Sequence, residues 1–178
     1  MPARASRSRL SSALVGVATL VVALALAPAA LAGKPATGPA ANFPYTFLAG
    51  APCANAVVFE NTSINARDTV FDPARDGSFR ILSRGSAVSR AVDQVTGAVY
   101  PMRGGYSFIT TFAADGSVRV DATGTDIIAW YFPGDDSDLG PGMWDTDGHV
   151  TEWYAPDGSF IKATFKGHAT DICAALEG

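Results

Sequence analysis

The sequence has few side chains suited to nucleophilic catalysis or metal binding, with two cysteines and two histidines in 178 residues. It contains no G-x-S-x-G, no H-E-x-x-H and no glycine-rich phosphate loop, which are the local signatures of serine hydrolases, zinc proteases and nucleotide-binding enzymes. No run of helical period stands out after residue 33, except a possible last turn at residues 174–177. These absences argue against a helical fold and against the enzyme classes that a short motif identifies.

Basic side chains are scarce, and only three of them are lysines. The chain has 13 Lys and Arg against 17 Asp and Glu, and its net charge is −4. Binding to a phosphate backbone or to an anionic membrane requires a surface rich in Lys and Arg. We therefore expect neither nucleic acid nor a membrane as a partner, and no motif indicates a cofactor.

The N-terminus lacks an apolar run long enough to span a bilayer. Three arginines precede an apolar segment at residues 13–27, which is shorter than the ~20 residues of a transmembrane helix. Ala30-Leu31-Ala32 then provides the small residues that a signal peptidase recognises. This order predicts a signal peptide over residues 1–32, cleavage after Ala32 and secretion, with an uncleaved anchor as the alternative.

The remainder of the chain divides into a leader and one domain. Residues 33–42 consist mostly of Gly, Pro, Ala and Thr without an apolar period, which predicts a flexible leader. Residues 43–178 are of the right length for a single hydrophobic core.

Short runs rich in β-forming residues follow, separated by Asp-Gly turns. The Asp side chain can accept local backbone hydrogen bonds, and Gly supplies the positive φ that such turns require. Each turn predicts a hairpin tip. The candidates are RDGS (75–78), ADGS (114–117), PDGS (156–159), the related TDGH (146–149) and QVTGA (94–98).

Between the turns, apolar and polar residues alternate. Val118, Val120 and Ala122 share one face, as in a strand with one side in a core and the other in water. The segment IIAWYF (127–132) is apolar on both faces and should be covered on both. The pattern predicts an all-β fold of about nine or ten strands joined by Asp-Gly hairpins, either an antiparallel up-and-down β-barrel or a β-sandwich.

Cys53 and Cys173 are the only cysteines and bracket nearly the whole predicted domain. In an exported chain they predict a disulfide, with free thiols or intermolecular bridging as alternatives. A bonded Cys173 could not act as a nucleophile or as a metal ligand beside His168 and Asp171. We therefore interpret the C-terminal cluster as a closure of the chain, and no metal site is expected there.

Residues 133–149 contain five aspartates and no Lys or Arg. Oxygen-rich loops of this kind can bind calcium, although the spacing does not match a helix-flanked calcium loop. A solvated acidic loop is the alternative. The calcium candidates are Asp135, Asp136, Asp138, Asp145 and Asp147.

Two charged residues interrupt the alternation. Glu152 shares a face with Val150 and Tyr154, and Arg90 shares a face with neighbouring valines. If these faces point inward, Arg90 could orient a ligand, and Glu152 could do so or act as an acid or base. Alternatively, Trp153 marks the inward face and both charges are in solvent.

Other candidates are a histidine and three tryptophans. His168 is a candidate acid or base near the end of the last strand. Most aromatic residues belong in a core, but three could line a ligand cavity, with Trp144 at its mouth. The three are Trp130, Trp144 and Trp153.

Four features together, the N-terminal segment, APCANAVV (51–58), YFPGDD with GPGMW (131–144) and GHATDICAAL (167–176), resemble small secreted β-rich proteins of high-GC Gram-positive bacteria. The resemblance implies export, a β fold and a terminal disulfide, but no activity and no functional residue. The layout is also similar to eight-stranded barrels such as the lipocalins, which is an analogy of fold alone.

The function most consistent with the sequence is binding of a small apolar or amphipathic ligand without catalysis. Two other classes stay open. One is an isomerase or cyclase built on a barrel, and the other is an extracellular interaction module that acts as an inhibitor through the acidic loop.

Overall fold

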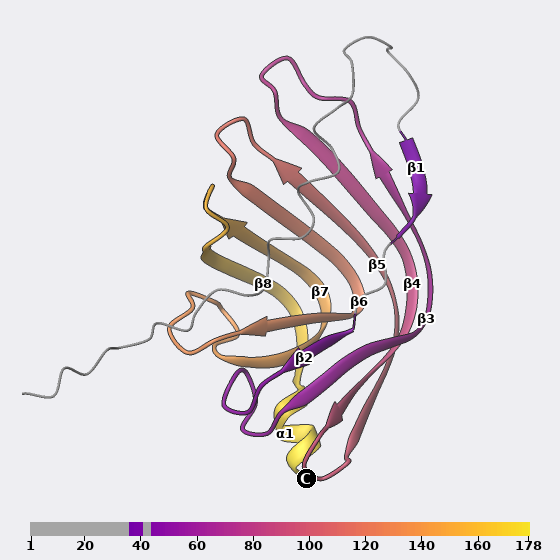
Figure 1. The fold of residues 1–178 in the computed structure, drawn as a ribbon, viewed down its shortest axis with the longest axis vertical. Helices are drawn as coiled ribbons and strands as arrows, with labels where there is room; N and C mark the ends of the chain where they lie inside the picture. The colour runs from indigo at the N-terminus through magenta and orange to yellow at the C-terminus, as the bar shows by residue number, and fades with distance from the viewer. Residues whose placement is uncertain (1–35, 41–43) are drawn as a thin grey trace, which may run out of the picture. The chain divides into compact units, whose positions relative to one another are not determined.

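The computed structural model describes residues 36–40 and 44–178, so the predicted signal peptide lies outside the described residues. Eight strands form one antiparallel sheet in the order β1-β3-β4-β5-β6-β7-β8, and β2 also pairs with β3 (Figure 1). Among the described residues, no helix has the length and apolar character that crossing a bilayer would require. The elements are β1 (Ala36–Pro39), β2 (Tyr45–Phe47), β3 (Val57–Val70), β4 (Phe79–Asp93), β5 (Val99–Phe112), β6 (Val118–Tyr131), β7 (Gly142–Tyr154), β8 (Phe160–Asp171) and α1 (Ile172–Glu177).

The all-β prediction is confirmed, but the sheet is not closed into a barrel, because β1 and β8 are at opposite ends of the strand order. The described residues form eight strands where nine or ten were expected. Six of them are 12 to 15 residues long. β1 lies within the segment predicted to be a flexible leader, and it pairs with the end of β3.

Three identical turns connect alternate strand pairs, as the sequence predicts. In the first, the Asp76 carboxylate accepts hydrogen bonds from the Ser78 backbone N–H at 2.9 Å and the Ser78 hydroxyl at 2.7 Å. Asp115 and Asp157 repeat this arrangement. The serine hydrogen bonds hold the pKa of all three carboxylates below the ordinary range. The predicted turn at residues 94–98 is also a hairpin tip, between β4 and β5.

The prediction of a hairpin tip at TDGH is wrong, because Gly148 lies in the middle of β7. It is in register with Gly124 of β6 and Gly167 of β8, and we call these three residues the glycine row. Their φ values are +147°, +148° and +146°. A Cβ on any of them would lie 2.1 to 2.2 Å from a carbonyl oxygen of a neighbouring strand. Only glycine fits this close approach. Each of the three strands that carry these glycines, β6, β7 and β8, bends sharply along its length (Figure 1).

The bend divides the sheet. β5 pairs with β6 only from Tyr106 to Phe112, and the pairing of β6 with β7 shifts in register between Gly124 and Ile127. Beyond that point β5 continues alongside β4, while β6 continues alongside β7. The main hydrophobic core lies between these two branches. Its buried residues are Phe47, Cys53, Val57, Phe59, Ala91, Met102, Met143, Ile172 and Leu176.

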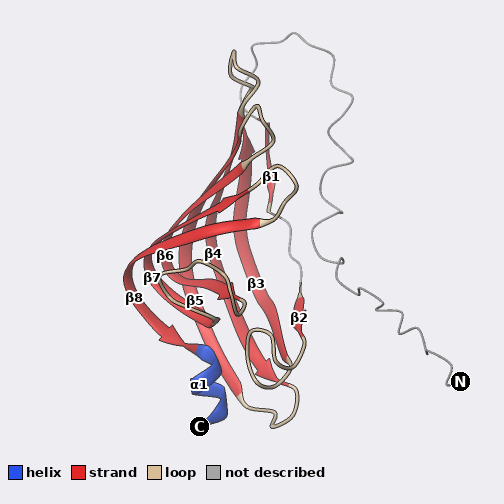
Figure 2. Cartoon of the chain, turned by 90° about the vertical axis from the view of Figure 1, so that its left-hand side faces the viewer, coloured by secondary structure: helices blue, strands red, loops and turns tan. Residues whose placement is uncertain are grey.

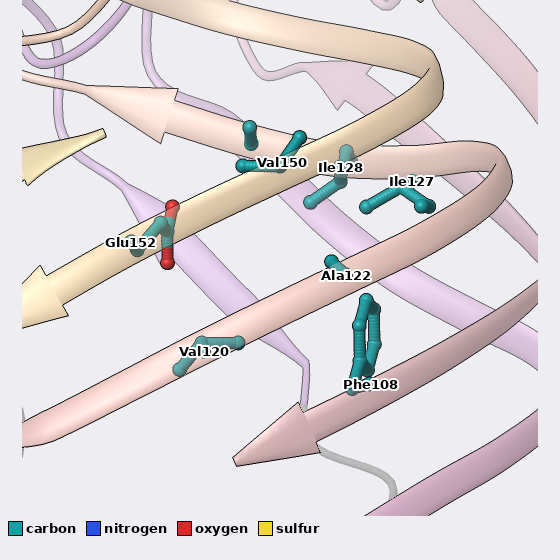
Figure 3. A pocket seen from close by; sticks show the side chains of 8 residues that line it. Phe108, Val120, Ala122, Ile127, Ile128, Val150 and Glu152 are labelled. Atoms are coloured by element: carbon teal, nitrogen blue, oxygen red, sulfur yellow. The ribbon is translucent and has the colours of Figure 1, made fainter. Parts of the chain in front are cut away.

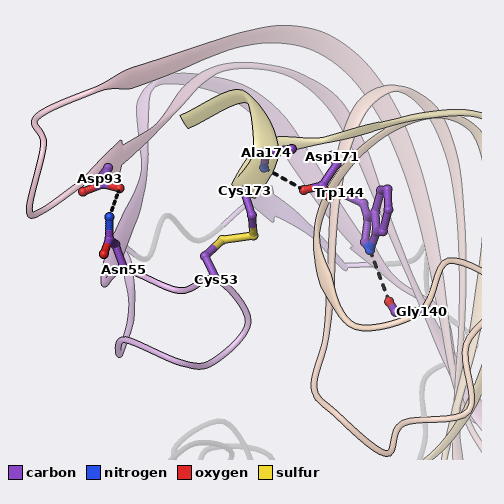
Figure 4. The surroundings of a disulfide bond; sticks show 8 residues. All are labelled: Cys53, Asn55, Asp93, Gly140, Trp144, Asp171, Cys173 and Ala174. Atoms are coloured by element: carbon purple, nitrogen blue, oxygen red, sulfur yellow. Dashed lines mark hydrogen bonds between the residues drawn. A yellow bond between two sulfur atoms is a disulfide. The ribbon is translucent and has the colours of Figure 1, made fainter. Parts of the chain in front are cut away.

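The C-terminal helix and the disulfide close this core. Figure 2 shows α1 directly after β8, away from the three Asp-Gly-Ser tips. The predicted bond between Cys53 and Cys173 is present (Figure 4). Asp171 caps the helix, since its carboxylate accepts a hydrogen bond from the Ala174 N–H at 3.1 Å. The C-terminal cluster therefore has the structural role that the sequence analysis favoured.

Candidate functional site

A small open pocket lies inside the bend of β6 and β7, and we call it the inner pocket (Figure 3). Val120 and Ala122 point into it from β6 before the bend. The register shift in β6 brings residues beyond the bend to the same side. The pocket has a volume of about 120 Å³ and is lined by Phe108, Val120, Ala122, Ile127, Ile128, Ala129, Val150 and Glu152.

Glu152 is the only charged residue in the lining of this pocket. One of its carboxylate oxygens accepts a hydrogen bond from the Tyr131 hydroxyl at 3.1 Å, and the other accepts from the Tyr154 hydroxyl at 2.7 Å. Burial, reinforced by the Glu152 charge, raises the pKa of both tyrosines, so both hydroxyls remain protonated donors. The two tyrosines therefore fix the position of the carboxylate in an otherwise apolar lining.

The loop between β6 and β7, residues 132–141, folds back onto the edge of β8. The Ala163 N–H donates to the Asp136 carbonyl at 2.8 Å, and the Phe165 N–H donates to the Asp138 carboxylate at 2.9 Å. Leu139 packs against the small buried cluster of Ala129, Tyr131 and Ala163. The loop thus adds an apolar side chain to the cluster that contains the tyrosine bonded to Glu152.

The structure does not bring the five calcium candidates together. Among the described residues, no group of three or more His, Cys, Asp or Glu side chains is arranged to hold a metal ion. Asp135 accepts a hydrogen bond from the Phe132 N–H, and Asp147 accepts one from the Asp126 N–H. Asp138 binds the edge of β8 as described above, so three of the five carboxylates have separate local roles.

Arg90, Trp130 and Trp144 do not line the inner pocket. Arg90 is exposed and forms an ion pair with Glu60. Trp130 packs against Tyr45 and Phe47 at the main core. The Trp144 indole N–H donates to the Gly140 carbonyl at 3.2 Å and supports the β6–β7 loop (Figure 4).

Trp153 and His168 also lie outside the pocket. Trp153 is on the opposite face of the sheet from Glu152, next to Arg119 and Lys162. His168 is exposed, in register with Asp147 of β7. Of the predicted acid, base and ligand-binding candidates, only Glu152 is in the pocket. Sequence reasoning missed the apolar lining, although Val120 and Ala122 were expected on an inward face.

Asp145 is a half-buried carboxylate where the two branches of the sheet meet. One of its oxygens accepts a hydrogen bond from the Tyr100 hydroxyl of β5 at 3.0 Å. The other is buried and has no hydrogen-bond partner among the described residues. Burial, together with the charges of Asp126 and Asp147, raises the pKa of Asp145 to about 6. The folded protein therefore holds this proton more tightly than the unfolded chain does.

Asp145→Asn should stabilise the protein at pH 8 and have little effect at pH 4. Because the folded pKa lies above the ordinary value, ionisation destabilises the fold progressively between about pH 4 and pH 6. Full burial would make this shift worth ~3 kcal/mol, but solvent screening of a half-buried group reduces it to ~1 kcal/mol. Urea denaturation of both proteins at the two pH values measures the difference. A gain at pH 4 equal to that at pH 8 would contradict the assignment.

Comparison of the chain with protein-family models, curated proteins and solved structures found no match. The resemblance to small secreted bacterial proteins therefore stays an expectation from sequence. The candidate function depends on the geometry of the inner pocket.

Proposed function

We propose that the protein binds a small apolar or amphipathic ligand in the inner pocket. The observation that carries this proposal is a partly open, apolar surface inside a bend, with one positioned carboxylate. Binding sites for small molecules commonly combine an apolar lining with a few polar groups that orient the ligand. Secretion, as the N-terminal sequence predicts, would place this function outside the cell, where a disulfide persists.

The dimensions of the pocket limit what it encloses. An apolar cavity of ~150 Å³ holds a ligand of the size of benzene, and the inner pocket has about 120 Å³. It therefore takes a ring or a short branched chain, while the rest of a larger ligand extends through the open side. Phe108 and Val150 contact the apolar part from opposite sides of the lining.

Glu152 gives the site its polar preference. Each carboxylate oxygen has about two acceptor positions, and one position on each is used by a tyrosine hydroxyl. The remaining positions accept a hydrogen bond from a ligand hydroxyl, amine or amide N–H. A carboxylate ligand is disfavoured, because it would place a second negative charge against Glu152.

A fluorescence titration with the neutral dye N-phenyl-1-naphthylamine tests the proposal. The dye has two aromatic groups, a naphthalene and a phenyl, joined by one N–H donor. Ala122→Phe fills the pocket and should weaken dye binding at least tenfold. Thr123→Phe is the matched control, because residue 123 is exposed on the other face of the same strand, and it should leave binding unchanged.

A second pair of variants distinguishes a change in the pocket from a general loss of folding. Val120→Asn makes the lining polar, and Ile109→Asn makes the same kind of change on the exposed face, where Ile109 is 38% exposed. Only Val120→Asn should weaken dye binding. Absence of dye binding to the wild-type protein, or equal losses within each pair, would refute the proposed function.

Catalysis at the same site is a second candidate, because Glu152 faces the pocket and could act as an acid or base. Glu152→Gln keeps the shape of the side chain and removes its ionisation. An isomerase or cyclase activity that uses Glu152 would be lost in this variant, whereas dye binding would persist, because the Gln side-chain oxygen still accepts a hydrogen bond from the dye N–H. An activity unaffected by Glu152→Gln would remove this assignment.

A further inference from the structure

The face of the sheet opposite the inner pocket carries two rows of residues that run across the strands, and we call it the outer face. The rows are defined by register, since residues paired on neighbouring antiparallel strands point to the same side. The first row contains Arg80, Thr111, Arg119, Trp153 and Lys162. The second contains Arg67, Arg84, Ser107, Thr123, His149 and Lys166.

These rows concentrate positive charge in a chain whose net charge is −4. All six of their Arg and Lys residues are exposed. A third row lies between these two and contains Asp121, which pairs with Ile109 and Thr151. Among the described residues, Asp121 is the only carboxylate in the three rows. It pairs with Arg119 at 2.7 Å and lies 3.6 Å from His149. The other five Arg and Lys residues of the two rows form no ion pair with a carboxylate among the described residues.

Arg67 and Arg84 are directly opposite one another on β3 and β4. Like charges in this position destabilise a sheet, and no carboxylate of the described chain compensates for them. A bound anion between the two guanidinium groups would turn this repulsion into two charge-assisted hydrogen-bond pairs. Repulsion between the two arginines therefore lowers the stability of the folded protein, and an anionic ligand would remove this repulsion.

The spacing of the cations indicates which kind of anionic polymer the outer face could bind. Arg80, Arg119 and Lys162 are on alternate strands β4, β6 and β8, so the backbones of successive cations in this row are separated by two strand spacings, about 9.6 Å. A disaccharide repeat has a similar length. A DNA strand carries a phosphate every ~3.4 Å along the helix axis, so the row would leave most of its phosphates unpaired.

The neutral residues of the outer face fit the same ligand. Hydroxyl side chains stand between the cations, as Thr111 and Thr123 do, and they can hydrogen-bond to sugar hydroxyls. The Trp153 ring is engaged by Arg119 at 5.7 Å and by Lys162 at 4.8 Å from its centroid. It is thus committed to cations rather than to stacking on nucleobases.

We propose that the outer face binds an acidic polysaccharide that carries sulfate or phosphate groups. The net charge of the chain argued against nucleic acid and anionic membranes as partners, but it averages over the whole chain, whereas neither of the two rows of the outer face contains a carboxylate. This site is separate from the inner pocket and does not depend on it.

Isothermal titration with heparin in 0.15 M NaCl tests the proposal, with neutral dextran as a blank. Arg67→Ser with Arg84→Ser should weaken heparin binding at least tenfold and make its salt dependence shallower. The control is Arg75→Ser with Arg90→Ser, which removes the same charge from a hairpin tip and from the Glu60 ion pair. It should change binding less than twofold. Without heparin, Arg67→Ser should raise the melting temperature, because it removes the repulsion from Arg84.

Three results would overturn the proposal. These are no heparin binding by the wild-type protein, equal weakening in the two double variants, or binding of a 24-base-pair DNA duplex as tight as that of heparin in the same buffer. Binding of N-phenyl-1-naphthylamine should be unchanged in both double variants. A failure of the outer-face proposal can therefore be distinguished from a failure of the inner-pocket proposal.

Discussion

Gly148→Ala should destabilise the protein by ~3 kcal/mol or more, because the new methyl group meets two penalties at once. An alanine at a φ of +148° adopts a backbone region that is nearly exclusive to glycine, which costs ~1–3 kcal/mol. Its Cβ would also lie 2.2 Å from the Lys166 carbonyl oxygen, so β7 and β8 would have to separate. Urea denaturation followed by circular dichroism measures the loss.

Gly158→Ala is the control for this prediction. Gly158 is in the PDGS turn at a φ of +81°, and nothing lies within 4 Å of a Cβ built there. This variant carries the backbone strain alone and should lose ~1–2 kcal/mol. Equal losses in the two variants would show that the strands are not in close contact at the glycine row.

Replacing both cysteines by serine should lower the free energy of unfolding by ~3–5 kcal/mol. The bond joins residues separated by 120 positions, and a cross-link of this span removes much of the conformational freedom of the unfolded chain. It also holds α1 against the main core, where Ile172 is completely buried. Urea denaturation with and without dithiothreitol measures the effect.

Reduction provides an internal check. Dithiothreitol should bring the wild-type protein to the stability of the Cys53→Ser/Cys173→Ser variant, and it should leave the variant unchanged. A variant within ~1 kcal/mol of the oxidised wild-type protein would mean that the unfolded chain gains little freedom when the cross-link is lost.

Features that depend on neighbours in the sequence could be predicted. The Asp-Gly-Ser tips form because Asp76, and its counterparts in the other two turns, accepts hydrogen bonds from a serine two positions away. The cap at Asp171 is also a local contact, across three positions. The disulfide joins residues 120 positions apart, but it could be predicted because the chain has only two cysteines.

The same local reasoning failed at Gly148, because its role is set by other strands. Asp147-Gly148 has the composition of a turn, yet its glycine is needed where β8 approaches β7. A usable signal was present. Gly148 and Gly167 lie at similar distances on either side of the PDGS tip, so a hairpin centred on that tip places them side by side.

The candidate site shows what alternation alone leaves open. The pattern put Glu152 and Val150 on one face and Trp153 on the other, but it did not say which face was inward. The contacts of Trp153 with Arg119 and Lys162 place it on the outer face. The register shift that brings Ile127 beside Ala122 depends on tertiary pairing and has no local signature.

The β6–β7 loop has a consequence for how an unclosed sheet persists in solution. A free strand edge is a template for pairing with another chain and so for aggregation. At β8 the backbone groups of Ala163 are already bonded to the loop, and at the other side of the sheet β1 and β2 cover parts of β3. An incoming strand would have to displace the loop, together with its negative charges, before it could add to β8. The β6–β7 loop at one edge, and β1 and β2 at the other, thus protect part of the sheet edges from pairing with another chain, as closure does in a barrel.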